Sequence, residues 1–184
     1  MARRHRYIAL LRAINVGGHV VKMDRLCELF EALGFANVST FIASGNVIFE
    51  SPAIDTQKLE RRIEKQLSDA LGYEVATFIR TPAELEAAIR YQAFPGVPES
   101  CPLAIGFLGD APDAAVCEAV AALRTEVDEF HVHGRELYWL CRAGMGGSLV
   151  PGKVLSRALG GKPVTTRNVT TVRKLATKYG AEAR

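Results

Sequence analysis

The sequence lacks the features that identify several large classes of protein. Its four cysteines are scattered and form no C-x-x-C pair, so no disulfide framework is predicted. No uninterrupted apolar stretch reaches the roughly 20 residues that a membrane-spanning helix needs. The basic start MARRHR precedes an apolar run that Arg12 and Asn15 interrupt, which is unlike a signal peptide. We therefore expect a cytoplasmic protein with free thiols and no membrane partner.

The net charge is also too small to indicate a partner. The 184 residues carry a net charge of +3 and are 48% hydrophobic and 23% charged, which is ordinary for a globular protein with one sizeable core or two small ones. Nucleic-acid binding usually needs a concentrated Lys/Arg face. This composition permits anionic partners without predicting one.

The periodicity of apolar residues predicts an alternation of helices and strands. Capping residues set several ends: Asp55 begins a helix with Ile54 packed on Leu59, and Thr81-Pro82-Ala83-Glu84 is a capping box. In the first half we expect strands at 7–11, 37–43, 47–50 and 74–80, and helices at 23–33, 55–71 and from 82 onward. In the second half we expect strands at 103–108, 129–133, 136–141 and 162–167, and helices at 112–125, 148–159 and 168–179.

The order strand, helix, strand, strand, helix, strand, helix thus occurs twice. It predicts an α+β fold of duplicated ferredoxin-like subdomains, each an antiparallel sheet with helices on one face. The proline- and glycine-rich stretch 92–100 is the best internal boundary. The predicted domains are residues 1–92 and residues 101–184, joined by a linker at 93–100.

Three separated motifs resemble a known family. They are R-x-I-N-V-G-G with a downstream K-M at 12–23, S-G-N-V-I-F-E-S at 44–51, and T-T-R-N at 165–168. In this order they resemble the bacterial family catalogued as domain of unknown function 1697. The resemblance implies a duplicated ferredoxin-like α+β fold and no established activity. This chain has Ala13 where that family usually has glycine.

Polar residues at strand ends and turns form the candidate ligand-binding set. A buried strand ends at Arg12, and two glycines after it let the backbone approach a ligand closely. If the set converges, it offers guanidinium groups, amides and a helix start, which suit a phosphate or carboxylate. The same residue types also serve turns and helix caps, so a structural role stays open. The set comprises Arg12, Asn15, Gly17, Gly18, Lys22, Ser44, Asn46, Arg167 and Asn168. We predict that Arg12 and Arg167 share one anionic ligand.

Several functions remain open at this stage. The favoured one is a binding protein for a small phosphate- or carboxylate-bearing ligand. The runner-up is RNA binding on the sheet face, where Tyr7 and Phe49 could stack bases, with basic residues on the last helix. A third is an enzyme acting on an anionic metabolite, although no nucleophile and base share a motif. His131 and His133 have a spacing that can chelate a metal, but without a third ligand we predict no metal and no cofactor. The oligomeric state and the catalytic residues are unknown.

Overall fold

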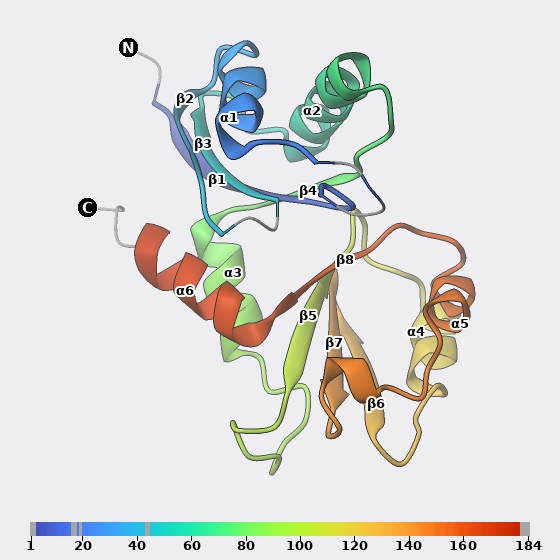
Figure 1. Cartoon of the computed structure of the whole chain (residues 1–184). Coiled ribbons are helices and arrows are strands. Elements are labelled where there is room, and N and C mark those ends of the chain that lie inside the picture. The colour runs from blue at the N-terminus through green and yellow to red at the C-terminus, as the bar shows by residue number, and fades with distance from the viewer. Residues whose placement is uncertain (1–2, 16–17, 19, 43–44, 181–184) are drawn as a thin grey trace. The chain divides into compact units, whose positions relative to one another are not determined.

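The computed structural model describes residues 3–15, 18, 20–42 and 45–180. The chain forms two compact units, residues 1–85 with 179–184, and residues 86–178. Figure 1 labels their elements. From the start of the chain these are β1 (His5–Leu11), α1 (Met23–Glu31), β2 (Ala36–Thr40), β3 (Asn46–Ser51), α2 (Thr56–Leu71), β4 (Thr77–Arg80) and α3 (Pro82–Arg90). They continue as β5 (Leu103–Phe107), α4 (Ala114–Ala121), β6 (Asp128–His133), β7 (Glu136–Cys141), a 3₁₀ turn (Met145–Gly147), α5 (Gly152–Ala158), β8 (Thr165–Asn168) and α6 (Val169–Tyr179). The predicted boundary at the linker stays a prediction.

Each half contains a four-stranded antiparallel sheet of the same topology. The strand orders are β2-β3-β1-β4 and β6-β7-β5-β8. In both, the first strand of the half lies between its third and fourth strands, as in a ferredoxin-like fold. The predicted α+β duplication is confirmed.

The pairing register makes the duplication visible at single residues. Ile8 in β1 pairs with Arg80 in β4, and Ile105 in β5 pairs with Arg167 in β8. Arg80 and Arg167 therefore occupy corresponding positions in the two halves. Both side chains are buried, at 0% and 9% exposure.

An aromatic cluster fills the core of the first unit. Phe49 lies 4.4 Å from Phe35 and 5.6 Å from both Phe30 and Tyr7, measured between ring centroids. These rings pack with apolar residues of α1 and α2, the two helices that cover one face of the sheet (Figure 1). Tyr7 and Phe49 are 3% and 0% exposed. They are core residues here, so the suggestion that they stack nucleic-acid bases is wrong.

The core of the second unit lies between its sheet and the helices α4 and α5. Val120 and Leu155 pack there with Phe130 and Leu137 of the sheet. On the opposite face, the hydroxyl of Tyr138 donates a hydrogen bond to the backbone carbonyl of Ala88 in α3 at 2.9 Å. This unit therefore buries residues on both faces of its sheet.

A buried carboxylate organises one end of the second sheet. Asp128 is 0% exposed and accepts hydrogen bonds from Trp139 Nε1 at 2.9 Å and Thr125 Oγ1 at 3.0 Å. The backbone N–H of Leu149 donates to the same carboxylate at 2.9 Å. Burial raises the pKa of Asp128, but these donors and Ser148 outweigh it and hold the pKa at about 2. The segment after β7 is thus fixed to the sheet by charge-assisted hydrogen bonds.

The local sequence signals were accurate at the starts of α2 and α3 and less so at α5 and for one exposed apolar residue. Asp55 accepts from Lys58 N at 3.0 Å, and the capping box from Thr81 to Glu84 is present. Ile54 is 78% exposed, so its predicted packing on Leu59 is wrong. Helix α5 begins at Gly152, later than predicted, because Pro151 precedes it with an extended backbone.

Candidate functional site

The loop after β1 is held by its backbone. Leu11 N donates to Gly45 O and Arg12 N donates to Ala76 O, both at 2.8 Å. Asn15 has a positive φ of 57°, and its side-chain oxygen accepts a hydrogen bond from Val21 N. Asn15 therefore closes the loop, which favours the structural role for this residue.

Two cations of the predicted set are exposed in this loop. Arg12 and Lys22 are both exposed, and Gly18 has a φ of +90° with open space where a side chain would be. Gly17 and Ser44 lie outside the described residues. Asn46, by contrast, is fully buried and its amide donates to Phe41 O at 2.9 Å. Asn46 thus holds the turn before β3 and faces no open surface.

The remaining predicted residues belong to the second unit. Arg167 donates to Thr165 Oγ1 and Thr166 O, each at 2.8 Å. Burial lowers its pKa to about 10. Asn168 is exposed at the end of β8, directly before α6. That Arg12 and Arg167 share a ligand stays a prediction, because the two residues belong to different units.

A hollow that the sequence did not indicate lies in the second unit. It has a volume of about 630 Å³ and lies between the end of α3, the segment 91–99, the start of β5 and the start of α6. A smaller hollow of about 400 Å³ adjoins it. The residues that line both are Glu99, Cys101, Leu103, Val169 and Arg173.

Guanidinium groups give this hollow its charge. Arg173 NH2 lies 3.6 Å from Glu99 Oε2, and the two side chains are 41% and 86% exposed. Arg90 also lines the hollow, and its guanidinium lies 3.4 Å from Glu86. Exposed pairs at such distances contribute at most about 1 kcal/mol. The guanidinium of Arg173 is therefore available to a competing anion.

Tyr91 contacts both histidines of β6. The hydroxyl of Tyr91 and Nε2 of His131 are hydrogen-bonded at 2.8 Å, and the Tyr91 ring stacks on His133 with centroids 3.9 Å apart. Burial, and next the charge of His133, lower the pKa of His131. Among residues 3–15, 18, 20–42 and 45–180, no group of three or more His, Cys, Asp or Glu side chains could hold a metal ion.

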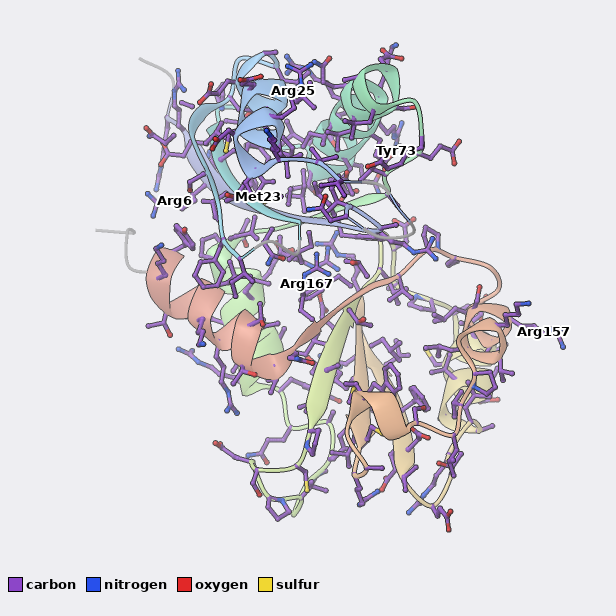
Figure 2. The ribbon with its side chains drawn as sticks, viewed as in Figure 1. Arg6, Met23, Arg25, Tyr73, Arg157 and Arg167 are labelled. Atoms are coloured by element: carbon purple, nitrogen blue, oxygen red, sulfur yellow. The ribbon has the colours of Figure 1, made fainter. Side chains whose placement is uncertain are left out.

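Basic residues are concentrated over a longer part of the second unit than the last helix, where the sequence already showed them. Eight of the 23 Lys and Arg residues, and none of the 20 Asp and Glu residues, lie between positions 137 and 181. Several of them are exposed, and Figure 2 shows Arg157 extending outward from α5. The low overall charge had concealed this asymmetry, because acidic residues elsewhere nearly balance it.

Comparison with known proteins settles the relationship that the motifs indicated. The family model described as "Protein of unknown function (DUF1697)" matches residues 4–138. The chain belongs to this family. A solved structure described as that of the conserved bacterial protein SP0830 from Streptococcus pneumoniae is similar, with a TM-score of 0.71 and 20% identity. The similarity covers 97% of this chain and 99% of that one, so the two share the fold.

The other comparisons add little about function. No curated protein matches the chain with significance. No helix among the described residues is long and apolar enough to cross a membrane.

Proposed function

We propose that this DUF1697 protein binds a small phosphate- or carboxylate-bearing ligand in the hollow of its second unit. The observation that carries this proposal is that Arg173 lines the hollow and its guanidinium is opposed by the carboxylate of Glu99, whose side chain is 86% exposed. A guanidinium presents paired donors that match carboxylate and phosphate oxygens. The carboxylate of Glu99 occupies the position that a ligand anion would take. Binding would replace the weak ion pair between Arg173 and Glu99 with a better-aligned ion pair between Arg173 and the ligand.

Other predicted site residues differ in how well they suit this proposal. Asn168 lines the smaller hollow and can contribute an amide. Arg12 and Lys22 are exposed cations in the first unit, and a contribution from their loop, with Gly17, Gly18 and Ser44, remains part of the proposal. The side chains of Asn15, Asn46 and Arg167 already make internal hydrogen bonds.

Cys101 offers a direct test because it lines both parts of the hollow. Alkylation by iodoacetate, an anion, is compared with alkylation by neutral iodoacetamide in a C27A/C117A background, where Cys141 is buried. A nearby cation attracts the anionic reagent. The rate with iodoacetate divided by the rate with iodoacetamide should therefore be about two- to tenfold higher in the folded protein than in the unfolded chain at low salt. Inorganic phosphate should slow the reaction of Cys101.

A matched pair of variants makes the result specific. R173Q should lower the rate ratio and remove protection by phosphate. R157Q removes the same charge from α5 of the same unit, away from the residues that line the hollow, and should change neither. If R173Q and R157Q behave alike, the anion site at Arg173 is wrong.

Nucleic-acid binding is the second candidate. Tyr7 and Phe49, the residues expected to stack bases, are buried in the core. The eight cations between 137 and 181 nevertheless favour nucleic-acid binding. Fluorescence polarisation with labelled single-stranded RNA over a salt series tests it, because neutralised phosphates give a steep salt dependence. Affinity that is independent of salt would contradict it. An enzyme acting on an anionic metabolite would use the same hollow, and product formation would distinguish it from a binding protein.

A cytoplasmic location is also part of the proposal. It is supported by the four cysteines, which are all free thiols in the structure.

A further inference from the structure

We infer that the free edge of the second sheet, formed by β8, binds an extended, acidic segment of a partner protein as an additional strand. This inference goes beyond the ligand proposed for the hollow, because it concerns a strand edge and a macromolecular partner. It comes from a comparison of the two halves of the chain. Each sheet ends in a fourth strand, β4 or β8, that pairs on one side only, and the other side of that strand differs between the halves.

The outer edge of β4 is closed by side chains of its own unit. Glu64 Oε1 accepts a hydrogen bond from Thr77 N at 2.9 Å. Glu60 Oε1 accepts one from Ile79 N at 2.7 Å, and both glutamates belong to α2. The carbonyl of Ile79 accepts from Arg80 Nη1 at 2.9 Å. Side chains thus take the place of a fifth strand, which protects this edge from pairing with another chain.

The pairing of β5 shows which backbone groups of β8 point outward. Successive residues of a strand direct their N–H and C=O groups to opposite sides. Leu108 N donates to Arg135 O at 2.9 Å, on the β7 side of β5. Ile105, three positions earlier, therefore directs its backbone groups toward β8, where it pairs with Arg167. It follows that the backbone groups of Thr166 point away from β5, toward the free side of the sheet.

The N–H of Thr166 lacks the carboxylate that closes the first sheet. Its carbonyl accepts from Arg167 Nη1 at 2.8 Å, as in the first half, but no residue among those the structure describes accepts a hydrogen bond from its N–H. Positions 137 to 181 contain no Asp or Glu, so α5 and the segment before β8 have no counterpart of Glu60 or Glu64. Thr166 is also exposed. This edge is therefore open to a strand from another molecule.

The charge around β8 favours an acidic segment as that strand. Lys162 is exposed before β8, Lys174 is exposed on α6 after it, and the guanidinium of Arg167 lies beside the outward carbonyl of Thr166. Backbone hydrogen bonds give an added strand its affinity, and complementary charge selects the partner. A second copy of this chain fits less well, because pairing of β8 with β8 would bring like charges together.

Selection of a phage-displayed library of random dodecapeptides on the full chain, at physiological salt, tests this inference. The enriched peptides should carry a net negative charge, and fluorescence polarisation then measures their affinities. T166P removes the outward N–H without removing a hydrogen bond to β5, so it should weaken the enriched peptides by about fivefold or more. T166A keeps the N–H and should bind them within about twofold of the unaltered chain. If no peptide is enriched, if the enriched peptides are not acidic, or if T166P and T166A bind equally, the inference is wrong.

Amide hydrogen exchange in the unaltered chain gives a second readout that holds even if T166P does not fold. An enriched peptide should slow exchange at the N–H of Thr166 by about tenfold or more when it is saturating, because that N–H becomes hydrogen-bonded. Unchanged exchange at Thr166 would overturn the inference. R173Q separates this edge from the hollow. Peptides that lose affinity in R173Q and keep it in T166P bind the hollow, which would overturn the strand addition and leave the proposed function standing.

Discussion

At the scale of single residues, Ala13 is held in a conformation that suits glycine better. Its φ is +59°, in the left-handed region that costs a residue with a side chain roughly 1 kcal/mol or more. The chain therefore tolerates strain at the start of the loop that follows β1.

We expect A13G to stabilise the protein by about 0.5 kcal/mol, because relief of the left-handed strain exceeds the entropy that glycine adds to the unfolded chain. Chemical denaturation measures the difference. A70G is the control, since Ala70 is exposed in α2 and glycine there should cost about 1 kcal/mol. Loss of stability in A13G would show that the loop does not require this backbone conformation.

Asp128 gives the protein a defined sensitivity to acid. Its pKa is lowered to about 2 in the folded state, from an ordinary value of 3.8. A lowered pKa means that the stability contributed by Asp128 is fully present above pH 4 and is lost as the pH falls toward 2. The difference corresponds to roughly 2 kcal/mol.

D128N should lose about 2 kcal/mol at pH 7, because an amide cannot accept all the hydrogen bonds that the carboxylate receives. Its free energy of unfolding should also vary less between pH 4 and pH 2 than that of the unaltered chain. Urea denaturation at several pH values measures both effects. D55N is the control for the stability at pH 7, as asparagine caps a helix about as well as aspartate. If the free energy of unfolding varies with pH in the same way for D128N and the unaltered chain, the lowered pKa of Asp128 is wrong.

At the scale of elements, the two first strands correspond position by position but differ at one of them. Ala9 in β1 pairs with Val47 and Ile79, and Gly106 in β5 pairs with Leu137 and Thr166. A Cβ at Gly106 would lie 2.9 Å from Val164 Cγ2 and 3.2 Å from Leu137 Cβ. The core of the second unit therefore packs closer to its first strand at this position.

We expect G106A to destabilise the protein by about 1 to 2 kcal/mol through overpacking. In G106A/V164A the contacting methyl groups of valine are gone, so the double variant should be more stable than the sum of the single effects predicts. G152A is the control, because nothing lies within 4 Å of a Cβ there. If the effects of G106A and V164A are additive, the side chain of Val164 moves away from the new methyl group at position 106 without an energetic cost.

Element order was predictable from the sequence because helix caps and apolar periodicity are local signals. Asp55 and the Thr81 capping box fixed two helix starts correctly. The ends of α4 and α5 were misplaced: α4 begins after Asp113, which accepts from Val116 N at 2.9 Å, rather than at Pro112. In α5 the apolar Val154 is 40% exposed, and a two-turn helix has too few residues for apolar periodicity to indicate which face is buried.

At the scale of the whole molecule, the duplication was predictable but the hollow was not. The repeated element order is enough to indicate two similar sheets. The hollow, however, is formed by Phe94, Leu140 and Arg173, which have no common motif and meet only through folding. The polar residues of the loop after β1 and of the turn before β3 were conspicuous in the sequence for a different reason. Asn15 and Asn46 form the internal hydrogen bonds of turns, and turn chemistry resembles ligand-binding chemistry.

The prediction that both halves contribute to one ligand can be tested with R12K and R167K. Arg12 is exposed, so R12K should leave the melting temperature nearly unchanged. R167K should lower it by several degrees, because the buried guanidinium donates to Thr165 and Thr166 and a lysine cannot reproduce both hydrogen bonds. Calorimetry measures the two melting temperatures.

Phosphate binding to the same variants then separates a shared site from the hollow alone. A phosphate held by both arginines requires that R12K and R167K each weaken binding by about 1 to 3 kcal/mol, since an ammonium replaces a bidentate guanidinium. R173K serves as the reference for the hollow. If R173K weakens phosphate binding and R12K does not, the shared site is wrong. The anion then binds within the second unit, and the cations of the loop after β1 have another role.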